Sequence, residues 1–110
     1  MAKIKLNDGR ILEDFTRPYF IAEVNSSHNG NIETAKQMIT KAKEIGSDCV
    51  KFQSWSAESL YSKNYYDANP ISKRIVSKFA FSEEQFLEII DFCKNLGIAF
   101  ASTPYSEGEV

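Results

Sequence analysis

Three apolar segments of this chain each end in polar side chains that can take part in chemistry. The segments are Phe20-Ile21-Ala22-Glu23, Val50-Lys51-Phe52-Gln53 and Phe100-Ala101-Ser102-Thr103-Pro104. The stretches between them show the three-and-four apolar spacing of amphipathic helices. Because strands that alternate with helices form parallel sheets, the polar side chains are expected to meet along one edge of such a sheet. The pattern therefore predicts an α/β fold with an anion site at the carboxyl ends of its strands.

The first part of the chain carries clear local signals. Asn7-Asp8-Gly9 predicts a tight turn, and hence a small β-hairpin over residues 3–12. A helix is expected between Asn31, whose side chain can cap an N-terminus, and Gly46, which suits the residue after a C-cap. A strand on each side of this helix completes a unit suited to a right-handed parallel crossover.

The second part repeats this order after a long connection. Residues 54–81 form an excursion rich in aromatic side chains, which indicates an ordered and functional loop with a short helix inside it. Ser82 and Gln85 form a capping box at the start of the next helix, which Gly97 ends. The third strand follows and stops at Pro104.

Side-chain alternation decides which groups share a face of the sheet. The helices need the bulky apolar faces of the strands. The opposite face is therefore expected to carry the polar strand-end residues Glu23, Asn25, Lys51, Gln53 and Thr103. Because a buried lysine needs a counter-charge, Lys51 and Glu23 are interpreted in two ways. They form an internal ion pair alone, or an anion-binding ammonium beside a carboxylate that handles protons.

The other polar residues also allow two interpretations each. Ser102 and Thr103 offer hydroxyl donors to phosphate or carboxylate oxygens, or they form a strand-end turn before Pro104. Gln53 can orient a substrate hydroxyl or satisfy backbone groups. His28 is interpreted as a loop histidine that bonds the backbone or solvent, or as a proton carrier and substrate contact at the mouth of the site.

Composition and charge exclude several classes of protein. The 110 residues carry a net charge of −2 with scattered lysines, so neither nucleic acid nor an anionic membrane is an expected partner. No apolar run approaches the roughly 20 residues that span a bilayer, and the N-terminus lacks a secretory signal. Cys49 and Cys93 lie in apolar patterns without metal-ligand spacing, which indicates reduced core residues in a cytoplasmic protein.

Four stretches are distinctive when they are taken together: Tyr19-Phe20-Ile21-Ala22-Glu23-Val24-Asn25, His28-Asn29-Gly30, Gly46-Ser47-Asp48-Cys49-Val50-Lys51-Phe52-Gln53 and Ala101-Ser102-Thr103-Pro104-Tyr105. In this order and spacing they resemble the N-acetylneuraminate (sialic acid) synthase family. The family often reads Gly-Ile-Asn where this chain has Asn25-Ser26-Ser27. It also includes synthases for legionaminic and pseudaminic acids, which these residues do not separate.

The resemblance implies a (β/α)8 TIM barrel. Residues 18–110 would form its first three βα units, an incomplete barrel, and a hairpin segment over residues 1–17 would precede them. The reaction that it implies is condensation of phosphoenolpyruvate with an N-acylated amino sugar such as N-acetylmannosamine, with release of phosphate.

The resemblance also assigns roles to single residues. Lys51 resembles the lysine that binds phosphoenolpyruvate, and Glu23 resembles the carboxylate near the sugar and the incoming water. Thr103, with Ser102 as its neighbour, resembles the phosphate or carboxylate contact. The remaining expected substrate contacts are Gln53, Asn25 and His28.

A divalent metal ion, Mn²⁺ or Mg²⁺, is implied as a Lewis acid, with its ligands beyond residue 110. The full-length protein is expected to be a homodimer, and this chain by itself is expected to be inactive. Two other interpretations stay open. One is another phosphate-binding α/β-barrel lyase or aldolase, in which Lys51 forms a Schiff base. The other is a free-standing module that associates through open sheet edges.

Overall fold

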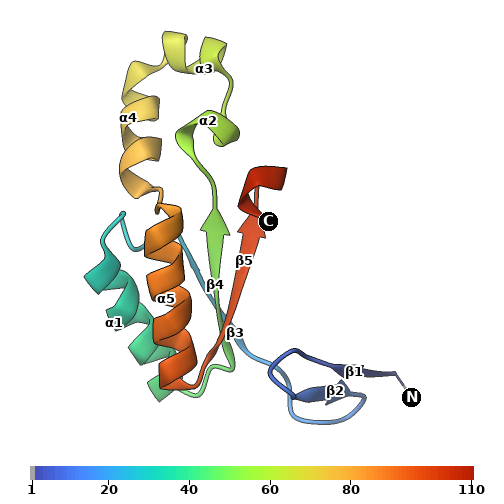
Figure 1. Ribbon diagram of the computed structural model, residues 1–110. Helices are drawn as coiled ribbons and strands as arrows, with labels where there is room; N and C mark the ends of the chain where they lie inside the picture. The colour runs from blue at the N-terminus through green and yellow to red at the C-terminus, as the bar shows by residue number, and fades with distance from the viewer. Residues whose placement is uncertain (1) are drawn as a thin grey trace.

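The computed structural model describes residues 2–110, so residue 1 of the expected hairpin segment lies outside the described residues. Figure 1 shows a parallel sheet with two long helices beside it, a hairpin near one end of the strands and a helical excursion beyond the other end. The expected α/β order is confirmed by these elements. No helix within residues 2–110 has the length and apolar character needed to cross a membrane.

The predicted hairpin is present. Strand β1 (Lys3–Lys5) pairs antiparallel with β2 (Ile11–Glu13). The turn is closed by a hydrogen bond of 2.9 Å from the Gly9 N–H to the Leu6 carbonyl. Gly9 has a φ of +88°, a backbone conformation that glycine adopts without a steric penalty.

The main sheet has the strand order β3-β4-β5, with all neighbours parallel. These strands are β3 (Ile21–Asn25), β4 (Cys49–Ser54) and β5 (Ala99–Pro104). Because β4 lies in the middle, polar groups on all three strands can gather around its side chains.

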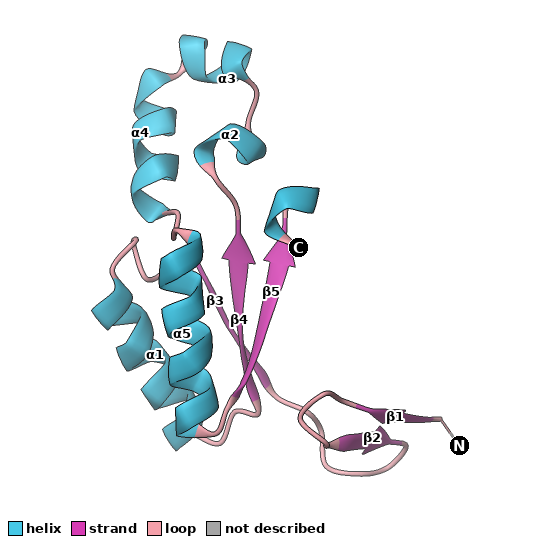
Figure 2. Cartoon of the chain, viewed as in Figure 1, coloured by secondary structure: helices cyan, strands magenta, loops and turns pink. Residues whose placement is uncertain are grey.

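Two helices connect the strands, and both lie on the same side of the sheet (Figure 2). They are α1 (Ile32–Glu44) and α5 (Glu83–Leu96). The Asn31 side chain accepts a hydrogen bond of 3.0 Å from the Thr34 N–H, which confirms the predicted cap. The capping box of Ser82 and Gln85 is likewise confirmed.

The core lies between these helices and the sheet. Val50 and Phe52 from β4 are fully buried, as are Ile39 of α1 and Ile89 of α5. Burial of each such side chain contributes about 1.5–3 kcal/mol to folding. This apolar layer fixes which face of β4 meets the helices, and hence which face its other side chains take.

The long connection is helical along much of its length, rather than a loop with one helix. It contains α2 (Ala57–Leu60), α3 (Lys63–Ala68) and α4 (Pro70–Phe79), and it extends beyond the carboxyl end of β4 (Figure 1). Side chains of Ser56 and Ser62 cap the two shortest helices, a local signal that the expectation of a loop missed. A final turn, η1 (Glu107–Glu109), follows β5.

Candidate functional site

The two faces of β4 differ in chemistry, as alternation predicts. Val50 and Phe52 point into the helix layer, where Phe100 of β5 packs beside them. The side chains that alternate with them along β4, Lys51 and Gln53, belong to the opposite face. The candidate site is therefore a set of polar groups on the sheet face that the helices do not cover.

Glu23 and Lys51 form the centre of this set. They are register partners on β3 and β4, and Lys51 Nζ lies 3.8 Å from Glu23 Oε2. Their expected pairing is therefore confirmed. The two side chains are 42% and 38% exposed, because three strands leave this face of the sheet open. An exposed ion pair contributes only about 0–1 kcal/mol to stability, so its contribution to folding does not explain its position.

Gln53 and Thr103 form the next layer toward the carboxyl ends of the strands. They are register partners on β4 and β5, and both are partly buried. Ala101 is the register partner of Lys51 on β5, and its small side chain leaves space beside the ammonium. Ammonium, amide and hydroxyl groups thus follow one another along the same face, a combination that can bind an anion with several oxygens.

The opposite end of this face is closed by Tyr19 and Cys49. Arg10 of the hairpin segment lies over the Tyr19 ring, with its guanidinium carbon 5.0 Å from the ring centroid. Burial, together with the nearby thiol and carboxylates, raises the pKa of Tyr19 to about 12. Cys49 and Cys93 are both buried and free, as expected for reduced core residues.

The structure places Ser102 on the strand face opposite Thr103, as alternation predicts. Its hydroxyl forms a hydrogen bond with the hydroxyl of Ser54, its neighbour across the sheet. Ser102 is the register partner of Phe52, so it lies on the helix-facing side rather than beside Lys51. Successive side chains of a strand point to opposite faces, so Ser102 and Thr103 lie on opposite faces of the sheet.

His28 also lies away from the mouth of the site. Its side chain is 1% exposed and is stacked on Phe81, with ring centroids 3.8 Å apart. The Nδ1 atom accepts a hydrogen bond of 2.9 Å from the Gly30 N–H, which confirms the interpretation as a backbone-bonding histidine. Burial lowers the pKa of His28 to about 4, so the ring is neutral near pH 7. The expectation of a substrate contact is corrected, because Phe52 and Phe81 enclose the ring.

Asn25 ends β3 in an unusual backbone conformation. Its φ is +54°, and the ladder of β3 on β4 is irregular between Glu23 and Asn25, so Asn25 is the register partner of Phe52. The expected place of Asn25 beside Glu23 and Lys51 is therefore wrong, because regular alternation ends at this irregularity. The Oδ1 atom is buried without a hydrogen-bond partner in the described part of the chain. The structure therefore explains Asn25 through its backbone, since asparagine enters the left-handed region more readily than other side-chain-bearing residues.

Sequence reasoning missed the role of Asp48. Its carboxylate accepts hydrogen bonds from Arg17 at 3.0 Å and from the Phe20 N–H at 2.8 Å. No periodicity reveals these contacts, because the partners lie 31 and 28 residues away in the sequence. The one available signal is an Asp at the start of a strand that otherwise reads as apolar.

Within residues 2–110, no group of three or more His, Cys, Asp or Glu side chains is arranged to hold a metal ion. The donors nearest to the candidate site are Glu23 alone and His28, which is enclosed by aromatic rings. These residues alone do not form a Mn²⁺ or Mg²⁺ centre, so none of them is assigned as a metal ligand.

Comparison with known proteins gives a consistent family match. The model of the NeuB family matches residues 38–110, which is more than half of the chain. The chain is 34% identical over 97 residues to the N-acetylneuraminate-9-phosphate synthase of Drosophila melanogaster, covering 81% of this chain and 26% of that protein. It is 32% identical over 101 residues to the N,N'-diacetyllegionaminic acid synthase of Legionella pneumophila, covering 84% and 28%.

Among solved structures, the fold is similar to the N-acetylneuraminic acid (sialic acid) synthetase of Leptospira borgpetersenii in complex with citrate. The TM-score is 0.84 at 22% identity, over 98% of this chain and 36% of that one. This likeness shows the shared fold. The chain spans less than a third of the length of the two curated relatives named above.

Proposed function

Because the chain belongs to the NeuB family, we propose that it supplies part of the active site of a sialic-acid-type synthase. The proposed reaction condenses phosphoenolpyruvate with an N-acylated amino sugar. In the proposed protein, residues 18–110 form the first three βα units of a (β/α)8 barrel, and the hairpin segment precedes them. Relatives named for N-acetylneuraminate-9-phosphate and diacetyllegionaminic acid support the class of product and leave the acyl sugar open.

One observation carries this proposal. Lys51 and Glu23 face each other at 3.8 Å on the uncovered face of the sheet, with Gln53 and Thr103 one layer nearer the strand ends. A cation beside a carboxylate, at a position that stability does not require, fits a site that holds an anion and moves a proton.

The proposed roles follow from the chemistry of each group. The Lys51 ammonium binds the carboxylate or phosphate oxygens of phosphoenolpyruvate, and the Thr103 hydroxyl donates to the same anion. The Gln53 amide orients a substrate hydroxyl. Glu23 accepts a proton from the water that adds to C2, as C3 bonds to the sugar aldehyde carbon and phosphate leaves with cleavage of its C–O bond.

A divalent Mn²⁺ or Mg²⁺ ion is proposed to polarise the sugar aldehyde, with ligands supplied elsewhere in the full-length protein. The homodimer expected from the resemblance and the cytoplasmic location expected from the two cysteines stay predictions. Light scattering on the full-length protein measures its oligomeric state.

The direct test is release of phosphate by the full-length protein. We expect release when phosphoenolpyruvate, Mn²⁺ and one member of a panel of N-acyl hexosamines are present together, and none when the sugar is omitted. Absence of release across the whole panel would contradict the proposed function.

The aldolase alternative makes a different prediction. A Schiff base requires a neutral Lys51, whereas here its ammonium lies beside Glu23. Borohydride treatment in the presence of a carbonyl substrate is therefore expected to leave the mass of the protein unchanged. A covalent adduct on Lys51 would favour the aldolase.

A further inference from the structure

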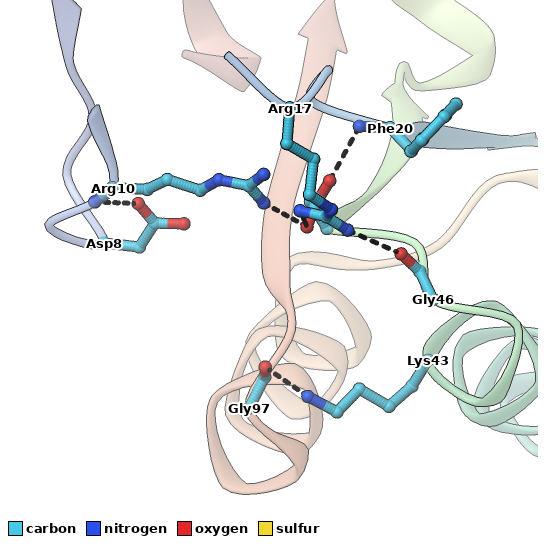
Figure 3. Close-up of polar contacts among 8 residues, drawn as sticks. Asp8, Arg10, Arg17, Phe20, Lys43, Gly46 and Gly97 are labelled. Carbon is cyan, nitrogen blue, oxygen red and sulfur yellow. Dashed lines mark hydrogen bonds and ion pairs between the residues drawn. The ribbon is translucent and has the colours of Figure 1, made fainter. Parts of the chain in front are cut away.

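Asp48 joins several segments at the point where β4 begins. Its Oδ2 accepts a hydrogen bond of 2.8 Å from the Phe20 N–H, and its Oδ1 accepts one of 3.0 Å from Arg17. The Arg10 guanidinium pairs with the same Oδ1. Arg10 belongs to the hairpin and Arg17 to the chain that follows it, and Figure 3 shows their side chains converging beside the Phe20 N–H. The Asp48 side chain is only 11% exposed, so protein groups rather than water surround it.

The Asp48 backbone also bonds to both neighbouring strands. Its N–H donates to the Phe20 carbonyl at 2.9 Å, and its carbonyl accepts from the Ala99 N–H at 3.1 Å. The carboxylate adds a further bond on the β3 side alone, at Phe20. Of the two neighbouring strands, β3 is therefore the one that the Asp48 side chain contacts directly.

Apart from Asp48, the apolar anchor of β3 is Val24, which is buried in the core and lies where the ladder becomes irregular. Ile21 is 51% exposed, and the paired part of the strand runs only from Ile21 to Glu23 before the ladder becomes irregular. Register is strongly specified where one face of a strand buries large apolar groups, and weakly specified elsewhere. The small side chain of Ala22 contributes little burial on the helix-facing side.

A change of register would alter the candidate site. The pairs now run Ile21 with Cys49, Ala22 with Val50 and Glu23 with Lys51. Because side chains alternate, a shift by one residue would turn Glu23 into the helix layer and remove it from Lys51. The Asp48 carboxylate lies next to the first of these pairs, Ile21 with Cys49, where it can oppose such a shift.

We propose that Asp48 is a positioning residue, which fixes the register of β3 on β4 and thereby holds Glu23 opposite Lys51. The activity readout of this inference rests on the proposed function, but the register readout does not. The hydrogen bond from Phe20, with those from Arg17 and Arg10, lowers the pKa of Asp48 to about 2. The carboxylate is therefore ionised throughout the pH range in which the test is run.

Two variants of the full-length protein separate the shape of the side chain from its charge. Asp48→Ala removes every side-chain contact, whereas Asp48→Asn can still accept the Phe20 hydrogen bond but loses the ion pairs. We expect Asp48→Ala to lower kcat for phosphate release at least 10-fold and to speed amide hydrogen exchange at residues 21–23 at least 10-fold. Asp48→Asn is expected to restore kcat to within about 3-fold of the parent.

A matched control distinguishes positioning from general loss of stability. Ile89→Val reduces the packing of α5, the helix that lies against α1 and β5, and it is compared at a temperature where every variant is folded. It should leave kcat and the exchange at residues 21–23 unchanged. Where Asp48→Ala does not fold, Arg17→Met serves as the second variant, because it removes one ion pair and leaves the carboxylate in place.

Each outcome decides the proposal. Unchanged exchange at residues 21–23 in Asp48→Ala overturns the register role, and faster exchange with unchanged kcat overturns the positioning role. If the parent protein releases no phosphate, the proposed function fails, and the exchange measurement alone decides whether Asp48 fixes the register.

Discussion

Gly30 packs directly against the backbone carbonyl of Lys78, with no room between them for a side chain. A Cβ at residue 30 would overlap the Lys78 oxygen, and it would lie 3.1 Å from the carbonyl carbon. This contact joins the loop after β3 to the end of α4. It also explains a glycine at a φ of +74°, a conformation that side chains disfavour.

We predict that Gly30→Ala destabilises the protein strongly. The backbone conformation alone costs alanine about 1–2 kcal/mol, and the overlap with a carbonyl adds to this because backbone cannot move aside cheaply. The total loss is expected to exceed about 3 kcal/mol. Chemical denaturation of parent and variant measures the free energy of unfolding.

Gly46→Ala is the matched control for this prediction. Gly46 has a φ of +92°, but nothing lies within 4 Å of the position that its Cβ would occupy. The free energy of unfolding of Gly46→Ala should therefore fall only by the cost of the backbone conformation, about 1–2 kcal/mol. Equal losses in the two variants would show that the contact with Lys78 contributes nothing.

His28 gives a prediction for the dependence of stability on pH. Burial lowers its pKa to about 4 in the folded protein, whereas the unfolded chain has the usual value near 6.5. The unfolded state therefore binds more protons between these values, and stability falls as the pH is lowered from 6.5 to 4. We expect a loss of about 2–3 kcal/mol over this range.

The measurement is the free energy of unfolding at several pH values, for the parent and for His28→Phe. Phenylalanine keeps the ring between Phe52 and Phe81 but cannot be protonated. The variant is expected to lose the slope between pH 6.5 and 4. Asp48 does not contribute in this window, because its stabilising effect is present above its unfolded pKa near 3.8 and is lost only toward pH 2. An identical slope in both proteins would assign the effect to other groups.

The sequence predicts elements well where the signal is local. The turn at Asn7-Asp8-Gly9, the cap at Asn31 and the capping box at Ser82 all involve contacts over a few residues, and all three are confirmed. Alternation also places Glu23 and Lys51 on one face correctly, since the apolar residues next to them in each strand must meet the helices.

The misses have a different physical origin. Asp48 and His28 owe their surroundings to segments distant in sequence, the hairpin segment and the residues around Phe81. Contacts of this kind depend on the packed arrangement, which no single-sequence periodicity encodes.

Asn25 allows a test of backbone conformation at the end of β3. Glycine is expected to fit its φ of +54° better than alanine, by about 1 kcal/mol. Glycine also removes the buried Oδ1 that lacks a partner. We therefore predict that Asn25→Gly is at least as stable as the parent and that Asn25→Ala is less stable than Asn25→Gly. Thermal unfolding ranks the three proteins.

The critical observation is which of the two variants, Asn25→Gly or Asn25→Ala, is more stable. In an ordinary strand glycine is less stable than alanine, by about 0.5–1 kcal/mol. Ala22→Gly, in the regular part of β3, should show this ordinary order. If Asn25→Ala proves more stable than Asn25→Gly, the left-handed conformation at this position is not what determines the stability.

Lys51 should separate activity from stability. Its ion pair with Glu23 is about 40% exposed at each side chain, so Lys51→Met is expected to change the free energy of unfolding by no more than about 1 kcal/mol. In the proposed function the same ammonium binds the anionic substrate, so kcat/KM for phosphate release should fall by about 10²–10³-fold. Lys41→Met removes another exposed ion pair, formed with Glu44 at 3.0 Å, and should leave kcat/KM unchanged. Denaturation measures the stability of both variants, and steady-state kinetics measures their activity. A Lys51→Met protein that keeps full activity would show that the pair of Lys51 and Glu23 is a surface contact without a role in the reaction.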